Sequence, residues 1–91
     1  MAGLTPDQPD RGAPNAAAAR LDAVGLKCPL PVLKTQAALA RLRPGELLEI
    51  AATDPMAAID IPHVAASGGH ALIESSRAGG VLRFVIRKGA D

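Results

Sequence analysis

The chain has a single cysteine, Cys28, and its thiol is the most reactive side chain in the sequence. It lies in the stretch GLKCPLPVLK, after Gly25 and Lys27 and before Pro29 and Pro31. Because proline fixes the backbone φ angle and has no N–H, we expect a rigid turn that holds the thiol outward. A predicted helix directly after Cys28 and the charge of Lys27 favour a lowered thiol pKa. We therefore predict a partly ionised, nucleophilic thiolate.

A lone thiolate can perform only a few kinds of reaction. A dithiol oxidoreductase needs a second cysteine, and one cysteine with two histidines falls short of a zinc-binding pattern, so no metal is expected. Acyl transfer needs a base beside the sulfur, which His63 or His70 would supply only if the fold brought one of them to Cys28. Attack on another sulfur atom needs no such base. The sequence thus favours a thiol that takes a sulfane sulfur as a persulfide and passes it on.

The elements that must position Cys28 follow from periodicity and from turn residues. A short strand over 21–25 precedes the cysteine, and a helix over 29–42 follows it with Cys28 as N-cap and Arg41 and Arg43 in its last turn. A strand is predicted over 46–53 and a helix over 61–67. Asp60 is the expected N-cap of that helix, because a proline such as Pro62 fits only the first turn, and 55–59 would form a separate helical turn capped by Asp54. Strands over 70–77 and 81–88 are joined by Ala-Gly-Gly, a hairpin signal.

Alternating apolar residues indicate which strand faces are buried. One face of the second strand carries Leu48, Ile50 and Ala52, and one face of the last strand carries Leu82, Phe84 and Ile86. The element order is β-α-β-α-β-β, and two helices must then cover one face of a four-stranded sheet. The predicted fold class is α/β, a two-layer α/β sandwich of about 70 residues.

Length and composition limit the functions to consider. The chain has 91 residues and a net charge of +1, so one small domain is expected and no strong attraction to nucleic acid or membranes. Phe84 is the only aromatic residue, which leaves no platform for base stacking. Residues 1–19 are rich in proline and poor in large apolar side chains, so we predict a disordered tail over 1–19 and a folded domain over 20–91. The unpaired cysteine favours a cytoplasmic location.

The stretch LDAVGLKCPLPVLK resembles the signature of the TusA/SirA-like sulfur carriers. In that family, the cysteine of a Cys-Pro-x-Pro motif receives persulfide sulfur and delivers it to an acceptor protein. The resemblance continues in four further blocks, at 44–46, 52–62, 67–70 and 84–89, and covers nearly all of 21–89. It implies a four-stranded mixed sheet with two helices on one side, in agreement with the pattern above.

The resemblance also implies roles for single residues. Cys28 would carry the sulfur without any cofactor, with Gly25, Pro29 and Pro31 shaping its loop. The positions Lys27 and Leu30 beside the cysteine are possible sites of partner docking. The same holds for Arg87 and Lys88, which match the family's basic end of the last strand, although Arg87 could instead pair with a carboxylate such as Glu49.

The implied partners are a cysteine desulfurase or a rhodanese-type donor and a downstream acceptor protein. The delivered sulfur would serve tRNA 2-thiouridine synthesis or other sulfur trafficking. Family members known for tRNA thiolation often have an acidic residue between the two prolines, where this chain has Leu30. Two alternatives remain: a regulatory protein-interaction module in which Cys28 is only structural, and a redox sensor that forms a mixed disulfide.

Overall fold

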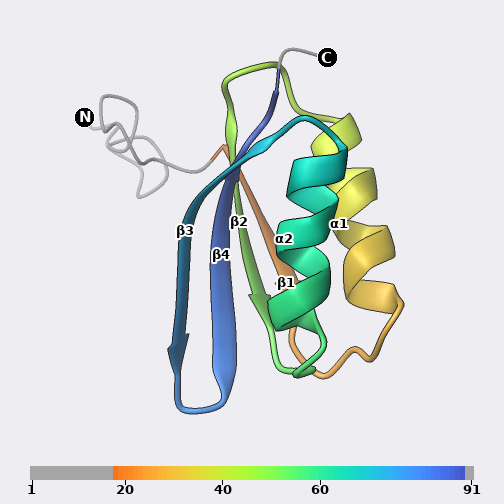
Figure 1. Cartoon of the computed structure of the whole chain (residues 1–91), viewed down its shortest axis with the longest axis vertical. Helices are drawn as coiled ribbons and strands as arrows, with labels where there is room; N and C mark the ends of the chain where they lie inside the picture. Colours follow the sequence, from red (N-terminus) through yellow and green to blue (C-terminus); the bar gives the residue numbers. More distant parts are fainter. Residues whose placement is uncertain (1–17, 90–91) are drawn as a thin grey trace, which may run out of the picture.

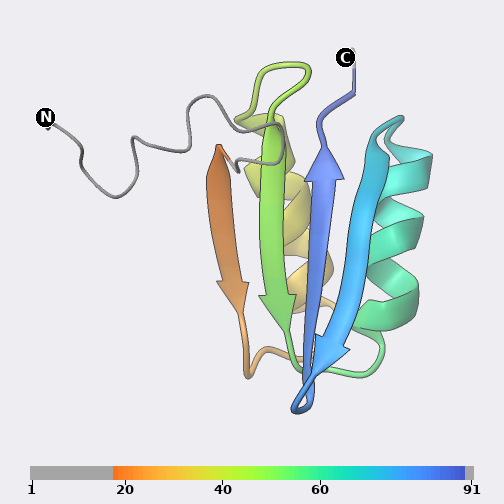
Figure 2. The same ribbon diagram turned by 90° about the vertical axis from the view of Figure 1, so that its left-hand side faces the viewer.

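Four strands and two helices make up the part of the chain that the computed structural model describes, residues 18–89. In chain order they are β1 (Ala19–Ala23), α1 (Leu30–Ala40), β2 (Leu47–Ala52), α2 (Ala57–Ser67), β3 (Ala71–Ala78) and β4 (Val81–Arg87). The strands form one mixed sheet in the order β1-β2-β4-β3, in which β1 is parallel to β2 and β4 is antiparallel to both of its neighbours. Both helices cover the same face of the sheet (Figure 1), and the other face is open (Figure 2). The predicted two-layer sandwich is confirmed.

The two central strands, β2 and β4, provide the sheet side of the hydrophobic core. Their inward faces are the predicted ones, and their residues lie opposite each other in register: Leu48 with Ile86, Ile50 with Phe84, and Ala52 with Leu82. The helices cover this surface with Leu39 from α1 and with Ile61, Val64 and Ala65 from α2. The core cluster holds twelve buried residues, and the burial of their apolar side chains is what stabilises a domain of this size.

Helix α1 is shorter than predicted at both ends. It begins at Leu30 with Pro29 as N-cap, so Cys28 lies one residue before the cap and the prediction of Cys28 as N-cap was wrong. It ends at Ala40, which leaves Arg41 and Arg43 beyond the last turn. Because proline has no N–H, this N-cap moves the first free N–H groups of the helix away from the cysteine.

Helix α2 is one continuous helix from Ala57 to Ser67, so the prediction of Asp60 as the N-cap of a helix over 61–67 was also wrong. Pro62 lies inside the helix, where its missing N–H leaves the carbonyl of Ala58 without its usual partner. The buried face of α2 begins at Ala57 and continues through Ile61. This packing offsets one lost hydrogen bond, because most helix stability in proteins comes from the buried face.

The turns that connect these elements use glycine at the expected places. The chain leaves α2 through Gly69, which has a φ of 78°, and the N–H of His70 donates to the carbonyl of Ala65, as in a Schellman motif. Gly79 and Gly80 both have positive φ angles and form the predicted β3-β4 hairpin. Neither helix in residues 18–89 has the length and apolar character needed to cross a bilayer. The predicted tail lies outside the described residues except for 18–19, and Ala19 is the first residue of β1.

Candidate functional site

The loop between β1 and α1 holds Cys28 at the surface, at the end of the sheet where the parallel strands β1 and β2 both finish (Figure 1). The loop starts with a turn at Gly25, whose φ of 84° is a conformation that favours glycine. The Gly25 N–H donates to the hydroxyl of Thr53, just after β2, over 2.8 Å. The exposed position of the thiol agrees with the sequence-based prediction.

Asp54, the residue after Thr53, fixes the backbone of the cysteine itself. One carboxylate oxygen accepts the N–H of Cys28 at 2.6 Å, and the other accepts the N–H of Met56 at 3.1 Å. These two hydrogen bonds hold the pKa of Asp54 below its usual value, and the bond from Cys28 has the larger effect. The charge of Lys27 lowers the pKa further. The carboxylate therefore ties the cysteine loop to the start of α2.

The thiol faces a second carboxylate, that of Asp60. The Cys28 Sγ lies 3.5 Å from Asp60 Oδ2 and donates a hydrogen bond to it. Incomplete hydration in the loop, the hydrogen bond to Asp60, and the negative charges of Asp60 and Asp54 raise the pKa of the Cys28 thiol. The prediction of a lowered thiol pKa was therefore wrong, because these contacts favour the neutral thiol over the thiolate.

The backbone explains why the start of a helix does not activate this thiol. Pro29 and Pro31 have no N–H to offer. The N–H of Leu30 donates to the carbonyl of Lys27 at 2.8 Å, and the N–H of Cys28 is taken by Asp54. The two prolines therefore offer no donor beside the sulfur, and the N–H groups of Cys28 and Leu30 are both taken, which weakens the effect of a helix N-terminus on a thiolate here.

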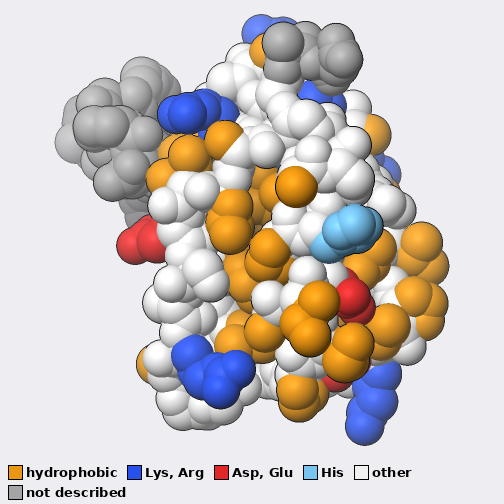
Figure 3. Space-filling model, viewed as in Figure 1, with side chains coloured by type: hydrophobic (Ala, Val, Ile, Leu, Met, Phe, Trp, Pro, Cys, Tyr) orange, Lys and Arg blue, Asp and Glu red, His pale blue; other side chains and the backbone are white. Residues whose placement is uncertain are grey.

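Exposed apolar side chains flank the cysteine on the first turns of both helices. Leu30 and Leu33 of α1 are 44% and 52% exposed, and Met56 and Ile59 at the start of α2 are 46% and 65% exposed. Figure 3 shows hydrophobic side chains gathered over this helical face, with acidic atoms among them. Because monomeric proteins rarely expose such clusters, this surface is suited to covering by a partner. We call Leu30, Leu33, Met56 and Ile59 the apolar rim.

The predicted docking residues do not form one surface. Lys27 and Leu30 lie beside the cysteine and are exposed, whereas Arg87 and Lys88 lie at the end of β4, near the opposite end of α1. An eleven-residue helix separates the two groups by about 16 Å. Glu49 pairs with Arg20 of β1 at 3.1 Å, and in the sheet it lies opposite Val85. The alternative of a Glu49–Arg87 pair is therefore not found among residues 18–89.

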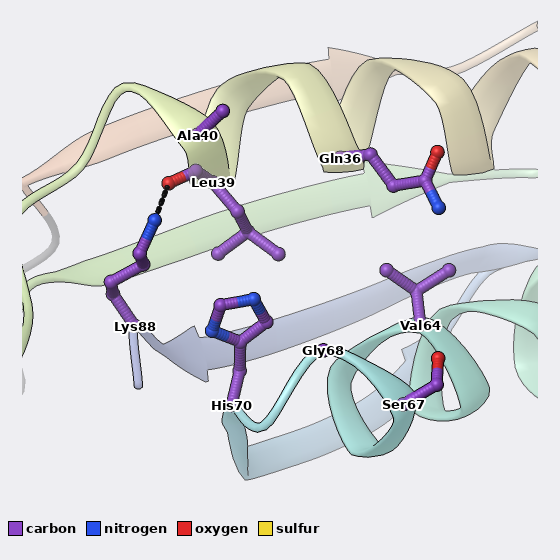
Figure 4. Close-up of a pocket in the computed structure, with 8 residues that line it drawn as sticks. All are labelled: Gln36, Leu39, Ala40, Val64, Ser67, Gly68, His70 and Lys88. Atoms are coloured by element: carbon purple, nitrogen blue, oxygen red, sulfur yellow. Dashed lines mark hydrogen bonds between the residues drawn. The ribbon is translucent and has the colours of Figure 1, made fainter. Parts of the chain in front are cut away.

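Lys88 has a structural role in this fold. Its side chain is buried, and its Nζ donates to the carbonyl of Leu39 over 2.6 Å (Figure 4). A cation at the C-terminal end of a helix is favourable, and here Lys88 takes the place that Arg41 and Arg43 were predicted to fill. Lys88 also lines a surface cavity of about 350 Å³ between the C-terminal ends of the two helices, far from the cysteine.

Neither histidine supplies a base to the thiol. His63 is exposed on α2, and His70 lies at the far end, where its Nδ1 accepts the N–H of Gly89 at 2.9 Å. Within residues 18–89, the one hydrogen-bond partner of the Cys28 sulfur is Asp60. No group of three or more His, Cys, Asp and Glu residues suited to a metal ion occurs in that range. The site can therefore perform thiol chemistry modulated by two carboxylates.

Asp54 and Asp60 are the site residues that the sequence analysis missed, since it interpreted both only as helix or turn caps. Each precedes a proline or a helical turn, which is the usual setting of a cap. The signal that could have found Asp54 is the parallel pairing of β1 and β2, because loops that follow adjacent parallel strands meet at the same edge of a sheet. Asp60 lies in the first turn of the helix that begins at this edge.

Comparison with known proteins identifies the family of this chain. The family described as "Sulfurtransferase TusA" matches residues 19–88. The chain belongs to the TusA family. It is 44% identical over 71 residues to the sulfur carrier protein TusA of Pseudomonas paraeruginosa, an overlap of 78% of this chain and 90% of that one. It is also 45% identical over 69 residues to YrkI of Bacillus subtilis, covering 76% of this chain and 92% of that protein.

The fold comparison agrees with this assignment. The crystal structure of a SirA-like protein from Desulfitobacterium hafniense aligns with a TM-score of 0.70 and 26% sequence identity, over 78% of this chain and 97% of that one. The resemblance noted in the sequence is thus confirmed. As a member of the TusA family, the chain has the role of a sulfur carrier, which takes sulfur from one protein and gives it to another.

Proposed function

We propose that Cys28 is the residue of this sulfur carrier that binds the transferred sulfur, and that it holds this sulfur as a persulfide. The observation that supports this most directly is that Cys28 is the only thiol in the sequence and is exposed on a loop fixed by two side-chain contacts. A carrier of sulfane sulfur needs a nucleophile that a donor can reach, and sulfur attacks sulfur readily. Because no second cysteine is present, the bound sulfur cannot be released by an internal disulfide.

The donor is a cysteine desulfurase or a rhodanese-type protein, and the acceptor is a protein with its own thiol. The sulfur serves tRNA 2-thiouridine synthesis or another route of sulfur trafficking. Leu30 between the two prolines is apolar and 44% exposed, which favours a donor or acceptor with an apolar contact at this point. A reduced thiol of this kind fits the cytoplasm. The reaction needs no cofactor bound to the carrier, and no direct contact with nucleic acid.

The experiment is mass spectrometry of the intact protein after incubation with a cysteine desulfurase and L-cysteine. We expect a mass gain of one sulfur atom that a reductant removes. Cys28→Ser is the matched variant, because it changes one exposed atom, and it should gain nothing while keeping the melting temperature of the wild type. If the wild type gains no sulfur from either class of donor, or if Cys28→Ser gains the same mass, the assignment to Cys28 is wrong.

The apolar rim favours one alternative, a protein-interaction module in which Cys28 only shapes the loop. The two functions differ in a cell that lacks the endogenous protein. Under the interaction hypothesis, Cys28→Ser restores function fully, whereas a variant of the rim such as Ile59→Ser does not. Under the carrier hypothesis, Cys28→Ser fails even though it still binds the partners of the wild type.

A further inference from the structure

Asp60 differs from Asp54 in how its charge is balanced. Both oxygens of Asp54 accept backbone N–H groups, and Lys27 acts electrostatically on that carboxylate. Asp60 is half-buried in the first turn of α2, and its carboxylate accepts a hydrogen bond from the Cys28 sulfur. Across residues 18–89, the one ion pair joins Arg20 to Glu49. No Lys, Arg or His nitrogen in that range therefore lies within ion-pair distance of Asp60.

When a partner covers the surface around Asp60, its unpaired carboxylate becomes unfavourable in free energy. The apolar rim lies on both sides of it, with Ile59 as its direct neighbour at 65% exposure. A partner that covers the rim removes water from Asp60, and burying an unpaired charge is strongly unfavourable. A basic side chain that meets Asp60 removes this cost and gains strength from the same loss of water. Charge complementarity therefore selects a partner with a cation inside an apolar contact surface.

We propose that Asp60 holds the Cys28 sulfur protonated in the free carrier, and that a Lys or Arg of the sulfur donor pairs with Asp60 on docking and so frees the thiolate. This inference rests on the proposed function of Cys28 as the persulfide carrier. The charged or titratable groups on the elements around the sulfur include Lys27 in its own loop and Asp54 after β2. The others are Asp22 near the end of β1, Lys34 on α1, and Asp60 and His63 on α2. Pairing with a donor cation would withdraw the oxygen that now accepts the Sγ–H bond, and would cancel the nearest negative charge.

The transfer step then balances without an added oxidant or reductant. The Cys28 thiolate attacks the outer sulfur of the donor persulfide, R–S–SH, and a new S–S bond forms on Cys28. The S–S bond of the donor breaks, and its electron pair stays on the inner sulfur, which leaves as a thiolate. The proton that Cys28 lost reaches that thiolate through solvent. The products are Cys28–S–SH and R–SH, so one sulfane sulfur has moved with no net oxidation.

The first test measures thiol ionisation in the free protein with the Asp60→Asn variant, which keeps the shape and removes the charge. The rate of alkylation of Cys28 by iodoacetamide, a neutral reagent, is followed against pH. We expect the inflection of Asp60→Asn to move to lower pH and its rate near pH 7 to rise at least about twofold, the effect of losing one modest hydrogen bond. Glu74→Gln on β3, which removes an exposed charge far from the sulfur, should match the wild type.

The second test compares two sulfur donors on the same variants. With glutathione persulfide, which has no docking surface, Asp60→Asn should take sulfur faster than the wild type. With a cysteine desulfurase loaded with L-cysteine, it should take sulfur more slowly despite its more reactive thiol, through a higher KM. The KM of the wild type should also rise more steeply with salt than that of the variant, because a charge pair is screened.

Two results would overturn the inference. An unchanged alkylation profile in Asp60→Asn means that Asp60 does not control protonation, and an equal or faster transfer from the desulfurase means that no donor cation pairs with it. Melting temperatures check folding, and Asp60→Ser replaces Asp60→Asn if the latter unfolds. Failure of the proposed function gives a different result: the wild type then gains no sulfur from either donor, while the alkylation profiles still report on Asp60.

Discussion

The backbone N–H of Cys28 donates to the carboxylate of Asp54 across 2.6 Å, although the two residues are 26 positions apart in the sequence. This bond joins the loop after β1 to the loop after β2, whose strands run parallel. The position of the reactive sulfur is thus a property of the assembled sheet. The same proximity places two carboxylates near the thiol, and their charges contribute to the raised pKa of Cys28.

Acid should weaken the fold through Asp54. Its pKa is lower in the folded protein than the ordinary value of 3.8, so its contribution to stability is present above about pH 4 and is lost as the pH falls through the lowered folded value. Urea unfolding should show that the wild type is more stable than Asp54→Asn at neutral pH. The difference should shrink towards pH 2. A difference that does not change with pH would show that the hydrogen bonds of Asp54 do not depend on its charge.

The thiol of Cys28 should react more slowly in the folded than in the unfolded chain. Its pKa is raised by incomplete hydration, by the bond to Asp60, and by the charges of Asp60 and Asp54, so less thiolate is present at a given pH below the inflection. Alkylation by iodoacetamide is measured against pH in buffer and in urea. The inflection should lie at higher pH in buffer. An inflection at lower pH in the folded protein would restore the helix-activation hypothesis that the structure contradicts.

Lys88 and Arg87 are neighbours, but their replacement should affect stability to very different extents. Lys88→Met keeps most of the buried stem but removes the charged hydrogen bond to Leu39, and should lower the free energy of unfolding by about 1.5–3 kcal/mol. Arg87→Met, at an exposed position, should change it by less than about 0.5 kcal/mol. Urea denaturation measures both. Sulfur acceptance should be unchanged in both variants, since they lie at the end of the domain away from Cys28; a loss in Arg87→Met alone would indicate docking there.

Gly25 should resist substitution because of its backbone and not because of crowding. A Cβ at this position meets no atom within 4 Å, but the φ of 84° disfavours side chains, so Gly25→Ala should cost about 1–2 kcal/mol. Gly25→Asn should cost less, because asparagine tolerates positive φ angles better. Thermal or urea unfolding of the two variants gives the comparison. Equal stability of Gly25→Ala and the wild type would mean that the turn adjusts its φ without cost.

The strands and the core were predictable from the sequence because alternation records burial directly. Leu48, Ile50, Phe84 and Ile86 are buried as the pattern indicated, and the glycine hairpin is formed. The helix boundaries were less predictable. Pro62 suggested a helix start at Asp60, but the buried side chain of Ala57 extends α2 upstream, since tertiary packing outweighs the loss of one hydrogen bond.

The sequence by itself identified the one thiol of this protein, the atom that we propose carries the sulfur. One cysteine between two prolines has to lie in a stiff exposed turn, whatever surrounds it. Only the tertiary structure decided the state of that atom, because a pKa depends on charges and hydrogen bonds through space. Parallel pairing of β1 with β2 and the packing of α2 bring Asp54 and Asp60 to Cys28, and these contacts raise the pKa of the thiol where the local sequence predicted a lowered one.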